Sequence, residues 1–327
     1  MRVLVTGGGG FIGSHLVERL LDDGHSVRVL DNFSTGHRSN LEAFGDHVEL
    51  IEGDVQSFER VQMAVRGCDV VLHQAALPSV PRSIQDPLTS NAVNVMGTLN
   101  VLLAARDNGV RRVVYASSSS IYGANPILPK VETLRAQPIS PYAVGKLAGE
   151  AYCQTFWEVY GLETVALRYF NVFGPRQDPS SQYSAVIPRF VNTCLDGGRP
   201  TIFGDGEQSR DFTYVGEVVR GNMLSMTAPN VAGSVLNLAC GHRVTLNGLL
   251  QAIRDVLGIE VEPVYAPARP GDLRHSTAAV EAARTALGFV NETSFETGLR
   301  DTIEYYQSHR KTLRERAAWR RPVPDEG

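Results

Sequence analysis

Tyr142 and Lys146 are two residues whose types and spacing suit acid–base chemistry. They stand four positions apart in the stretch SPYAVGKLAGE, and residues at i and i+4 lie on one face of a helix. An ammonium group beside a phenol favours the phenolate, which lowers the pKa of the tyrosine from about 10 toward neutral pH. Tyr142 is therefore a candidate general base, on a helix that we expect to extend to about Tyr160. A packed ring beside a solvated amine is the common alternative, so the surroundings must decide.

Four consecutive serines in the stretch ASSSSIYG, residues 116–123, come directly after an apolar segment that is typical of a buried strand. In a parallel sheet, ligands bind beyond the carboxyl ends of the strands. If a strand covers 112–117, these hydroxyl groups face a ligand. The alternative, which suits Ser117 and Ser120 best, is that the hydroxyls satisfy backbone groups where the strand ends.

The N-terminal segment predicts a phosphate-binding turn between a strand and a helix. An apolar run at 2–6 is followed by four glycines, and apolar residues then recur at helical spacing. Gly7, Gly10 and Gly13 form a GxxGxxG pattern, in which small residues let the backbone approach a pyrophosphate at a helix N-terminus. A tight turn without a ligand is the alternative for the glycines taken alone.

Asp31 makes the dinucleotide interpretation stronger. It ends the next predicted strand, 26–30, at the distance where a carboxylate binds the adenosine ribose. The same carboxylate repels a 2′-phosphate, which favours NAD over NADP. His37 and Arg38 lie nearby and weaken this preference, because they are cationic or can become so.

The remaining N-terminal half alternates apolar strands with amphipathic helices, which predicts a parallel sheet covered on both faces. The further expected elements are strands at 48–51, 69–73, 112–117 and 163–168, and a helix at about 87–106. The segments after 170 are irregular and rich in Pro, Gly and charge. They suggest a smaller second lobe.

Composition favours small-molecule chemistry. The 327 residues carry a formal net charge of -4, so no basic field favours nucleic acid or an anionic membrane. The four cysteines form no CxxC, which argues against a metal site and a disulfide framework and for a reducing, cytoplasmic setting. We expect no membrane segment, because no run of 18 apolar residues occurs and the N-terminal run is too short for a signal sequence.

Several motifs in one order resemble the extended short-chain dehydrogenase/reductase family, and more narrowly its nucleotide-sugar 4-epimerases. They are TGGGGFIG, Asp31 with Asn32, the serine run ending in YG, and YAVGK, and the likeness covers roughly residues 1–308. The resemblance implies an α/β fold, with a Rossmann-type doubly wound parallel sheet and a smaller mixed α/β C-terminal substrate-binding lobe. The implied division is an NAD-binding domain at 1–170 with a contribution from about 234–240, a UDP-sugar lobe at 171–310 and a polar tail at 311–327.

The resemblance also implies which residues act. The catalytic hydroxyl is four positions before the tyrosine of the YG pair, at Ser118, and it acts with Tyr142 and Lys146. Related dehydratases carry an Asp-Glu pair directly after this hydroxyl, and related decarboxylases a Glu two positions after it. Here both positions, 119 and 120, are serines. Without such an acid, the site can oxidise and reduce C4 of the sugar, which predicts a 4-epimerase.

By the same likeness the cofactor is NAD. Its implied contacts are Gly7, Gly10, Phe11, Ile12, Gly13, Asp31, Asn32, Ser34, Thr35, Gly36, Asp54, Val55, Gln74, Ala75, Ala76, Asn94, Ser117, Tyr142, Lys146 and Tyr169. The implied substrate is a UDP-sugar, with guanidinium groups gripping the pyrophosphate. Its implied contacts are Ser79, Ser118, Asn171, Ala185, Val186, Thr201, Phe203, Arg210, Arg269, Asp272 and Ser276.

Ser276 bears on the choice of sugar. The corresponding position is a bulky Tyr in epimerases restricted to glucose and galactose, so a serine leaves room for an N-acetyl group. The expected reaction interconverts UDP-GlcNAc with UDP-GalNAc, and also UDP-Glc with UDP-Gal, through a 4-keto sugar. Pro78 stands in a loop that close relatives build with Gly, and it removes a backbone donor near the site. Alternatives are a UDP-uronic acid 4-epimerase, another sugar-nucleotide dehydratase or decarboxylase, or a non-catalytic NAD-sensing protein. A homodimer is expected.

Overall fold

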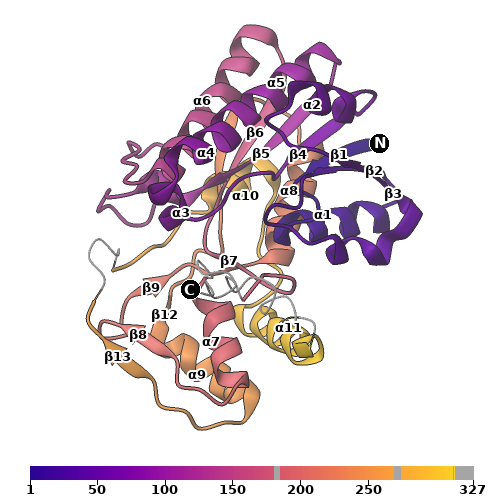
Figure 1. Cartoon of the computed structure of the whole chain (residues 1–327). Helices are drawn as coiled ribbons and strands as arrows, with labels where there is room; N and C mark the ends of the chain where they lie inside the picture. Colours follow the sequence, from indigo (N-terminus) through magenta and orange to yellow (C-terminus); the bar gives the residue numbers. More distant parts are fainter. Residues whose placement is uncertain (180–184, 269–273, 312, 314–327) are drawn as a thin grey trace, which may run out of the picture.

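A seven-stranded parallel sheet forms the centre of the computed structural model, which describes residues 1–179, 185–268, 274–311 and 313 (Figure 1). The strand order is β11-β6-β5-β4-β1-β2-β3, and every neighbouring pair is parallel. The strands are β1 (Arg2–Thr6), β2 (Ser26–Asp31), β3 (Val48–Glu52), β4 (Val70–His73), β5 (Arg112–Ser118), β6 (Glu163–Tyr169) and β11 (Ser234–Leu238).

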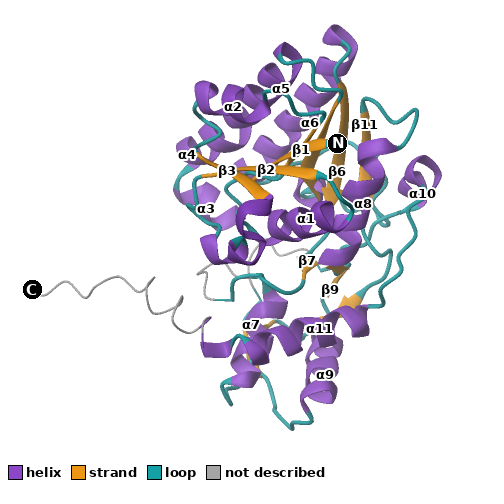
Figure 2. Cartoon of the chain, turned by 90° about the vertical axis from the view of Figure 1, so that its right-hand side faces the viewer, coloured by secondary structure: helices purple, strands orange, loops and turns teal. Residues whose placement is uncertain are grey.

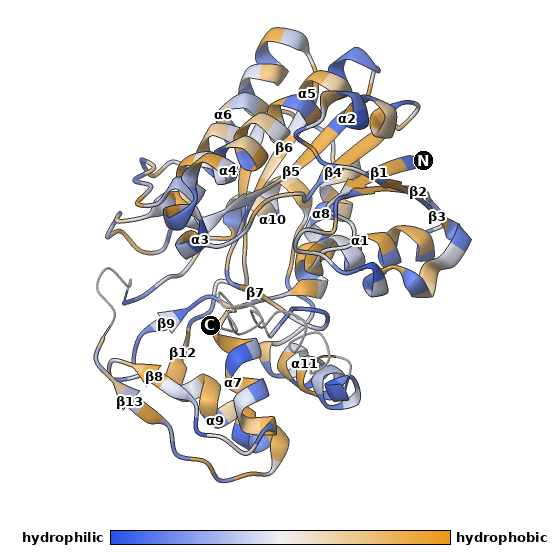
Figure 3. Cartoon of the chain, viewed as in Figure 1, coloured by the Kyte–Doolittle hydropathy of each residue, from blue (hydrophilic) through white to orange (hydrophobic). Residues whose placement is uncertain are grey.

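Helices cover both faces of this sheet, so the predicted doubly wound α/β fold is confirmed. One face packs against α1 (Phe11–Asp22), α8 (Val215–Thr227) and α10 (Glu281–Leu287). The other packs against α2 (Phe58–Val65), α5 (Gly97–Asp107) and α6 (Pro141–Tyr160). Figure 3 shows the hydrophobic strands between these layers. The central strands are nearly continuous runs of Val, Leu and Ala because both of their faces are buried.

Two strands extend one residue beyond their predicted ends. Asp31 is the last residue of β2 and Ser118 the last residue of β5. The pairing of Ser118 with Tyr169, at the end of β6, keeps β5 regular to that point. Both side chains therefore stand at the carboxyl edge of the sheet, where ligands bind in such folds.

A smaller lobe lies below the sheet in Figure 1, and Figure 2 shows the same separation from the side. Its core is a cluster of buried apolar side chains from three helices and short strands. The elements are β8 (Thr201–Phe203), β9 (Ser209–Arg210), β12 (Val244–Thr245), β13 (Val264–Ala266), α7 (Val186–Leu195), α9 (Leu246–Leu257) and α11 (Phe295–Ser308). Between the two parts, β7 (Val172–Phe173) pairs with β10 (Thr213–Tyr214).

The chain crosses between the two parts more often than the predicted division allows. The expected contribution of 234–240 to the sheet corresponds to β11. However, α8 and α10, which fall inside the predicted 171–310 lobe, also pack on the sheet. Helix α8 packs on β5 and β6, and α10 packs on β11 and on α8. Most of the predicted tail at 311–327 lies outside the described residues.

Helical structure runs through the segment Pro87–Asp107, from α4 (Pro87–Asn91) through a π-helical turn, Ala92–Met96, into α5. By length and composition alone this segment meets the criterion for a membrane-spanning helix, and half of it is buried inside the fold. It packs on α2 and α6 in the manner of a core helix. The short helix α3 (Val80–Gln85) precedes it.

Candidate active site

Helix α6 positions Tyr142 and Lys146 beside the end of β5. Ser140 caps its N-terminus by accepting a hydrogen bond from the backbone N–H of Ala143 at 3.2 Å, and Pro141 occupies the first turn. The backbone N–H of Tyr142 donates to Ser83 Oγ at 3.0 Å. The predicted helix and its end at Tyr160 are confirmed.

Lys146 is almost fully buried. Its Nζ donates to the carbonyl oxygen of Ala116 at 2.7 Å and lies 5.9 Å from the centre of the Tyr142 ring. Burial lowers the pKa of Lys146 to about 8, and the neighbouring Cys153 and Glu150 oppose this shift. A group with this pKa is still mostly cationic at neutral pH.

The phenol of Tyr142 is subject to two opposing influences. Burial raises its pKa, and hydrogen bonding with the Ser118 side chain lowers it. Ser118, at the end of β5, and Tyr142, in the first turn of α6, thus share one site. The Ser118 hydroxyl favours the phenolate by hydrogen bonding, and the Lys146 ammonium group lies 5.9 Å from the centre of the ring.

The serine run ends β5 and begins a 3₁₀ helix, Ser119–Tyr122. Ser118 Oγ accepts a hydrogen bond from the backbone N–H of Ser120 at 3.2 Å and caps this helix. Ser117 points to the opposite side of the strand and donates to Glu150 at 2.5 Å. Its hydroxyl is buried, and the cofactor contact expected of Ser117 stays a prediction.

The glycine turn after β1 is shaped to receive a dinucleotide phosphate. A Cβ on Gly13 would stand 2.1 Å from the carbonyl oxygen of Gly7, and Gly7 itself has φ of 72°. Helix α1 then begins after Gly10, whose residue type supplies no capping side chain, and its first turn contains no acidic residue. Free backbone N–H groups at such a terminus favour an anion. These residues therefore fit the pyrophosphate of NAD.

The adenosine end of the predicted cofactor site is built by the ends of β2 and β3. The Asp31 carboxylate accepts hydrogen bonds from the backbone N–H groups of Gly9 at 2.8 Å and Phe33 at 2.7 Å. Burial raises its pKa, and these N–H groups oppose the shift. Next to it, Asn32 donates to Asp54 at 2.7 Å. Asp31 thus fixes the glycine turn, and its contact with the adenosine ribose stays a prediction.

A hydroxyl–amide cluster lies at the ends of β4 and β6. Gln74 donates to the Tyr169 hydroxyl at 3.1 Å, and Asn222 of α8 donates to the same hydroxyl at 2.8 Å. Sequence reasoning predicted Gln74 and Tyr169 but not Asn222. Asn94 is buried and exchanges two hydrogen bonds with the backbone of Leu77, so its side chain holds the loop after β4.

The other predicted cofactor residues follow strand ends or open α1, at the same edge of the sheet. A Cβ on Gly36 would contact the backbone of Gly9, which places the loop after β2 against the glycine turn. The predicted residues in these positions are Phe11, Ile12, Ser34, Thr35, Gly36, Val55, Ala75 and Ala76.

A pocket of about 260 Å³ lies in the smaller lobe. Six predicted substrate residues line it, and so do Arg189 and Gln208, which sequence reasoning missed. The six are Asn171, Ala185, Val186, Thr201, Phe203 and Arg210. Ser79 caps α3, and Ser276 is held through its backbone N–H to the Ser209 carbonyl at 3.1 Å. Neither of them, nor Ser118, is part of this lining. Arg269 and Asp272 lie outside the described residues.

Asp211 anchors the wall of the pocket. This fully buried carboxylate accepts hydrogen bonds from the backbone N–H groups of Cys240, Gly241 and Ala278 at 3.0 to 3.1 Å. Burial raises its pKa to about 6, against the effect of these N–H groups. Its backbone carbonyl accepts from the Asn171 side chain at 3.0 Å. Gln208, which lines the pocket, donates to the Phe203 carbonyl. The side chains of Gln208 and Asp211, on either side of Arg210 in the sequence, are thus both held by backbone groups.

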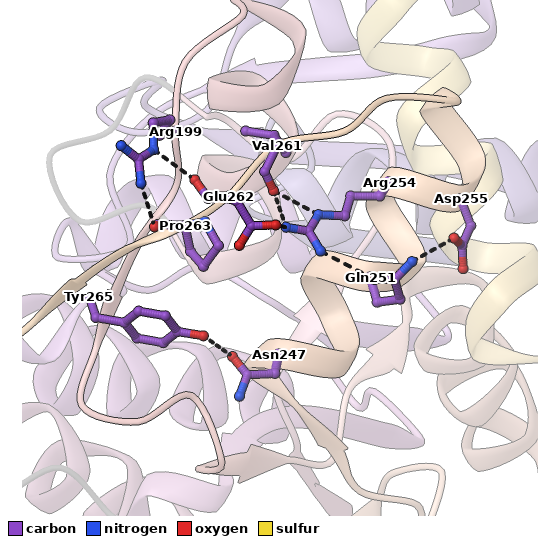
Figure 4. Close-up of polar contacts among 9 residues, drawn as sticks. All are labelled: Arg199, Asn247, Gln251, Arg254, Asp255, Val261, Glu262, Pro263 and Tyr265. Atoms are coloured by element: carbon purple, nitrogen blue, oxygen red, sulfur yellow. Dashed lines mark hydrogen bonds and ion pairs between the residues drawn. The ribbon is translucent and has the colours of Figure 1, made fainter.

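Two arginines hold the segment that leads into β13, which pairs with the pocket strand β8 (Figure 4). Arg199 donates to the carbonyl oxygens of Glu262 and Pro263 at 2.9 and 3.0 Å. Arg254 of α9 donates to the carbonyl of Val261. These contacts fix the segment before β13, and β13 in turn pairs with β8.

Residues 3–239 match the NAD dependent epimerase/dehydratase family, and the chain belongs to this family. It is 38% identical over 312 residues to the UDP-glucose 4-epimerase of Mycolicibacterium smegmatis, covering 94% of this chain and 99% of that one. The solved UDP-N-acetylglucosamine 4-epimerase of Methanobrevibacter ruminantium M1, in complex with UDP-N-acetylmuramic acid, is 42% identical with a TM-score of 0.90, covering 94% and 98%. A UDP-glucuronic acid 4-epimerase from Bacillus cereus, solved with NAD, is 30% identical with a TM-score of 0.87, covering 94% and 99%.

Proposed function

We propose that this protein is an NAD-dependent UDP-sugar 4-epimerase that interconverts UDP-GlcNAc with UDP-GalNAc and UDP-Glc with UDP-Gal. One observation carries the proposal. Ser118, Tyr142 and Lys146 meet at the end of β5, while the two positions that follow Ser118 are serines rather than acids. Such a site can move a proton on and off the 4-hydroxyl group, and it offers no carboxylate there to eliminate water.

Each residue of the site has its own role in the reaction. Bound NAD⁺ supplies the acceptor and later the donor of the hydride at C4. Tyr142 takes the proton of the 4-hydroxyl group as general base and returns it after the 4-keto sugar has turned. Ser118 holds the phenol and the sugar oxygen in line by hydrogen bonding. Lys146 keeps a positive charge beside the phenol and stabilises the phenolate.

The smaller lobe is suited to hold the nucleotide while the sugar turns. Arg210, Asn171 and the neighbouring Arg189 line the pocket and supply the polar groups for a pyrophosphate. Thr201 and Phe203 supply backbone and ring contacts to the base. In this proposal the nucleotide is held firmly and the hexose loosely, because rotation of the keto sugar requires it.

The function is tested by incubating the purified protein with UDP-GlcNAc, UDP-Glc and UDP-glucuronic acid separately and resolving the products. Conversion of each neutral sugar to its 4-epimer, with no loss of water or carbon dioxide, is the expected result. Epimerisation of the uronate alone would instead support the second candidate, a UDP-uronic acid 4-epimerase. That candidate is favoured by the 30% identity to the Bacillus cereus enzyme.

We also propose that the protein is a homodimer through the face formed by α4, the π-helical turn Ala92–Met96 and α6. This face exposes Leu88, which is 83% exposed, together with Met96, Val144, Val159 and Tyr160. Large apolar side chains on one face are typical of an interface. Light scattering should give about twice the chain mass of 35.6 kDa, and Leu88→Arg should shift it toward one chain mass.

A further inference from the structure

The loop 174–178 connects the substrate pocket to the cofactor edge of the sheet. It continues directly from Asn171 and Phe173, which line the pocket. From the end of β6 it reaches helix α1, which follows β1. In the sheet, β5 and β4 separate β6 from β1, so three strand spacings, about 14 Å, lie between these strands. The loop therefore spans the same edge along which a dinucleotide would extend.

Helix α1 holds the first half of this loop. His15 lies 2.9 Å, through Nε2, from the carbonyl oxygen of Pro175. Burial lowers the pKa of His15 to about 4, so the ring is neutral at pH 7 and donates this hydrogen bond through Nε2–H. One turn further along α1, Glu18 forms an ion pair with Arg176 at 2.7 Å. Arg176 has φ of 64°, so the loop takes a left-handed turn where it meets the helix.

The second half of the loop is held beside the glycine turn. His37 Nε2 lies 3.4 Å from a carboxylate oxygen of Asp178. The backbone N–H of His37 donates to the Gly9 carbonyl at 2.9 Å. The loop thus contacts two elements beside the expected pyrophosphate position. They are α1 and the segment around His37, which is bonded to Gly9.

The interior of the loop is also tied to the smaller lobe. The Tyr306 hydroxyl of α11 donates to the Gln177 carbonyl at 2.7 Å. Arg176 Nη1 and Gln177 Oε1 are buried, and neither has a hydrogen-bond partner among the described residues. Buried polar groups require a partner, so these two atoms are free to accept a partner that the described residues do not supply.

We propose that residues 174–178 form a cofactor clasp, which must separate from α1 and His37 before bound NAD can leave. The proposal rests on NAD binding at the glycine turn, as in the proposed function. His15, Glu18, Arg176 and Asp178 are positioning residues in this scheme. Their contacts retain the cofactor while one substrate molecule leaves and the next binds. They take no part in proton or hydride transfer.

The charge pair between Glu18 and Arg176 offers a direct test. Glu18→Arg and Arg176→Glu each place like charges at the contact, and the double variant restores an opposite pair. Each protein is loaded with NAD⁺ and freed of excess by gel filtration. Release is then followed with excess alcohol dehydrogenase and ethanol, which convert each released NAD⁺ to fluorescent NADH. Each single variant should release NAD about tenfold faster than the wild type, and the double variant should approach the wild-type rate.

Arg19→Glu is the matched control. It places like charges against Asp23, the C-terminal cap residue of α1, where the native pair has a length of 2.9 Å and does not involve the loop. Its release rate should equal that of the wild type. If a charge-reversal variant fails to fold by circular dichroism, Glu18→Gln replaces it, with release expected to be several-fold faster.

The clasp proposal would be overturned if the folded single variants released NAD at the wild-type rate. It would also be overturned if the double variant released NAD as fast as the single variants. The readout needs no sugar turnover. A protein that holds NAD behind the clasp but epimerises no UDP-sugar would contradict the proposed function and leave the clasp supported.

Discussion

Lys146 Nζ lies 5.9 Å from the centre of the Tyr142 ring and donates its hydrogen bond to the backbone of Ala116, 2.7 Å away. The ammonium group is therefore fixed by β5 and not by the phenol. As a result, the position of this charge relative to Tyr142 depends on how α6 packs against the strand. Ser118, two residues after Ala116 on β5, is fixed by the same packing.

Tyr142→Phe should lower kcat by roughly 10² to 10⁴-fold, because it removes the general base and preserves the ring packing. The variant should still retain NAD, since the glycine turn and Asp31 are untouched. Turnover of UDP-Glc and the amount of bound NAD are measured on the same preparation. Near wild-type turnover would remove Tyr142 from the mechanism.

Asp31→Ala should weaken NAD binding and reduce discrimination against NADP. The change removes the ribose acceptor and the charge that repels a 2′-phosphate. It also frees the backbone N–H of Gly9, which the carboxylate holds at 2.8 Å. Asp31→Asn, which keeps one acceptor oxygen, should lose less NAD affinity while losing the same charge. Titration of both dinucleotides gives the two affinities, and unchanged NAD binding in Asp31→Ala would show that the ribose is held elsewhere.

Asp211→Asn should lower the free energy of unfolding by about 1 to 3 kcal/mol, because an amide NH₂ would face backbone N–H donors. The effect should depend on pH. The pKa of Asp211 is raised from 3.8 to about 6 in the folded state, so between these values the folded protein binds more protons than the unfolded chain. This group therefore adds stability as pH falls from 6 to 4, and the variant lacks that gain.

Thermal unfolding of wild type and Asp211→Asn at pH 7 and pH 5 checks this expectation. The difference in Tm between them should be larger at pH 5 than at pH 7. Asp205→Asn is a suitable control, because Asp205 is an exposed carboxylate in the same lobe. A difference that is equal at both pH values would contradict the raised pKa.

Ser276→Tyr tests the choice of sugar. If the small side chain admits an acetamido group, the added ring should reduce activity on UDP-GlcNAc and spare UDP-Glc. A clash of this kind costs on the order of 1 to 3 kcal/mol, or roughly 5- to 150-fold in relative kcat/KM. Both epimerisations are measured on wild type and variant. An equal loss on both substrates would mean that Ser276 supports local folding, since its backbone N–H is bonded to Ser209.

Local features of the chain were predictable from sequence because neighbouring residues determine them. The i,i+4 spacing of Tyr142 and Lys146 and the cap at Ser140 define the start of α6. The glycines after β1 define a turn that larger residues cannot form. Alternation of apolar strands and helices was enough for the doubly wound sheet, because each strand there is buried on both faces.

Only the tertiary structure decided which distant residues support these groups. Ser117 donates to Glu150, which pairs with Arg168 at 2.7 Å. Asn222 reaches Tyr169 only because α8 returns to the sheet. The ion pair of Glu18 with Arg176 joins residues 158 positions apart. Sequence spacing specifies contacts along one helix or turn, whereas these contacts follow from strand order and helix packing, which the whole chain determines together.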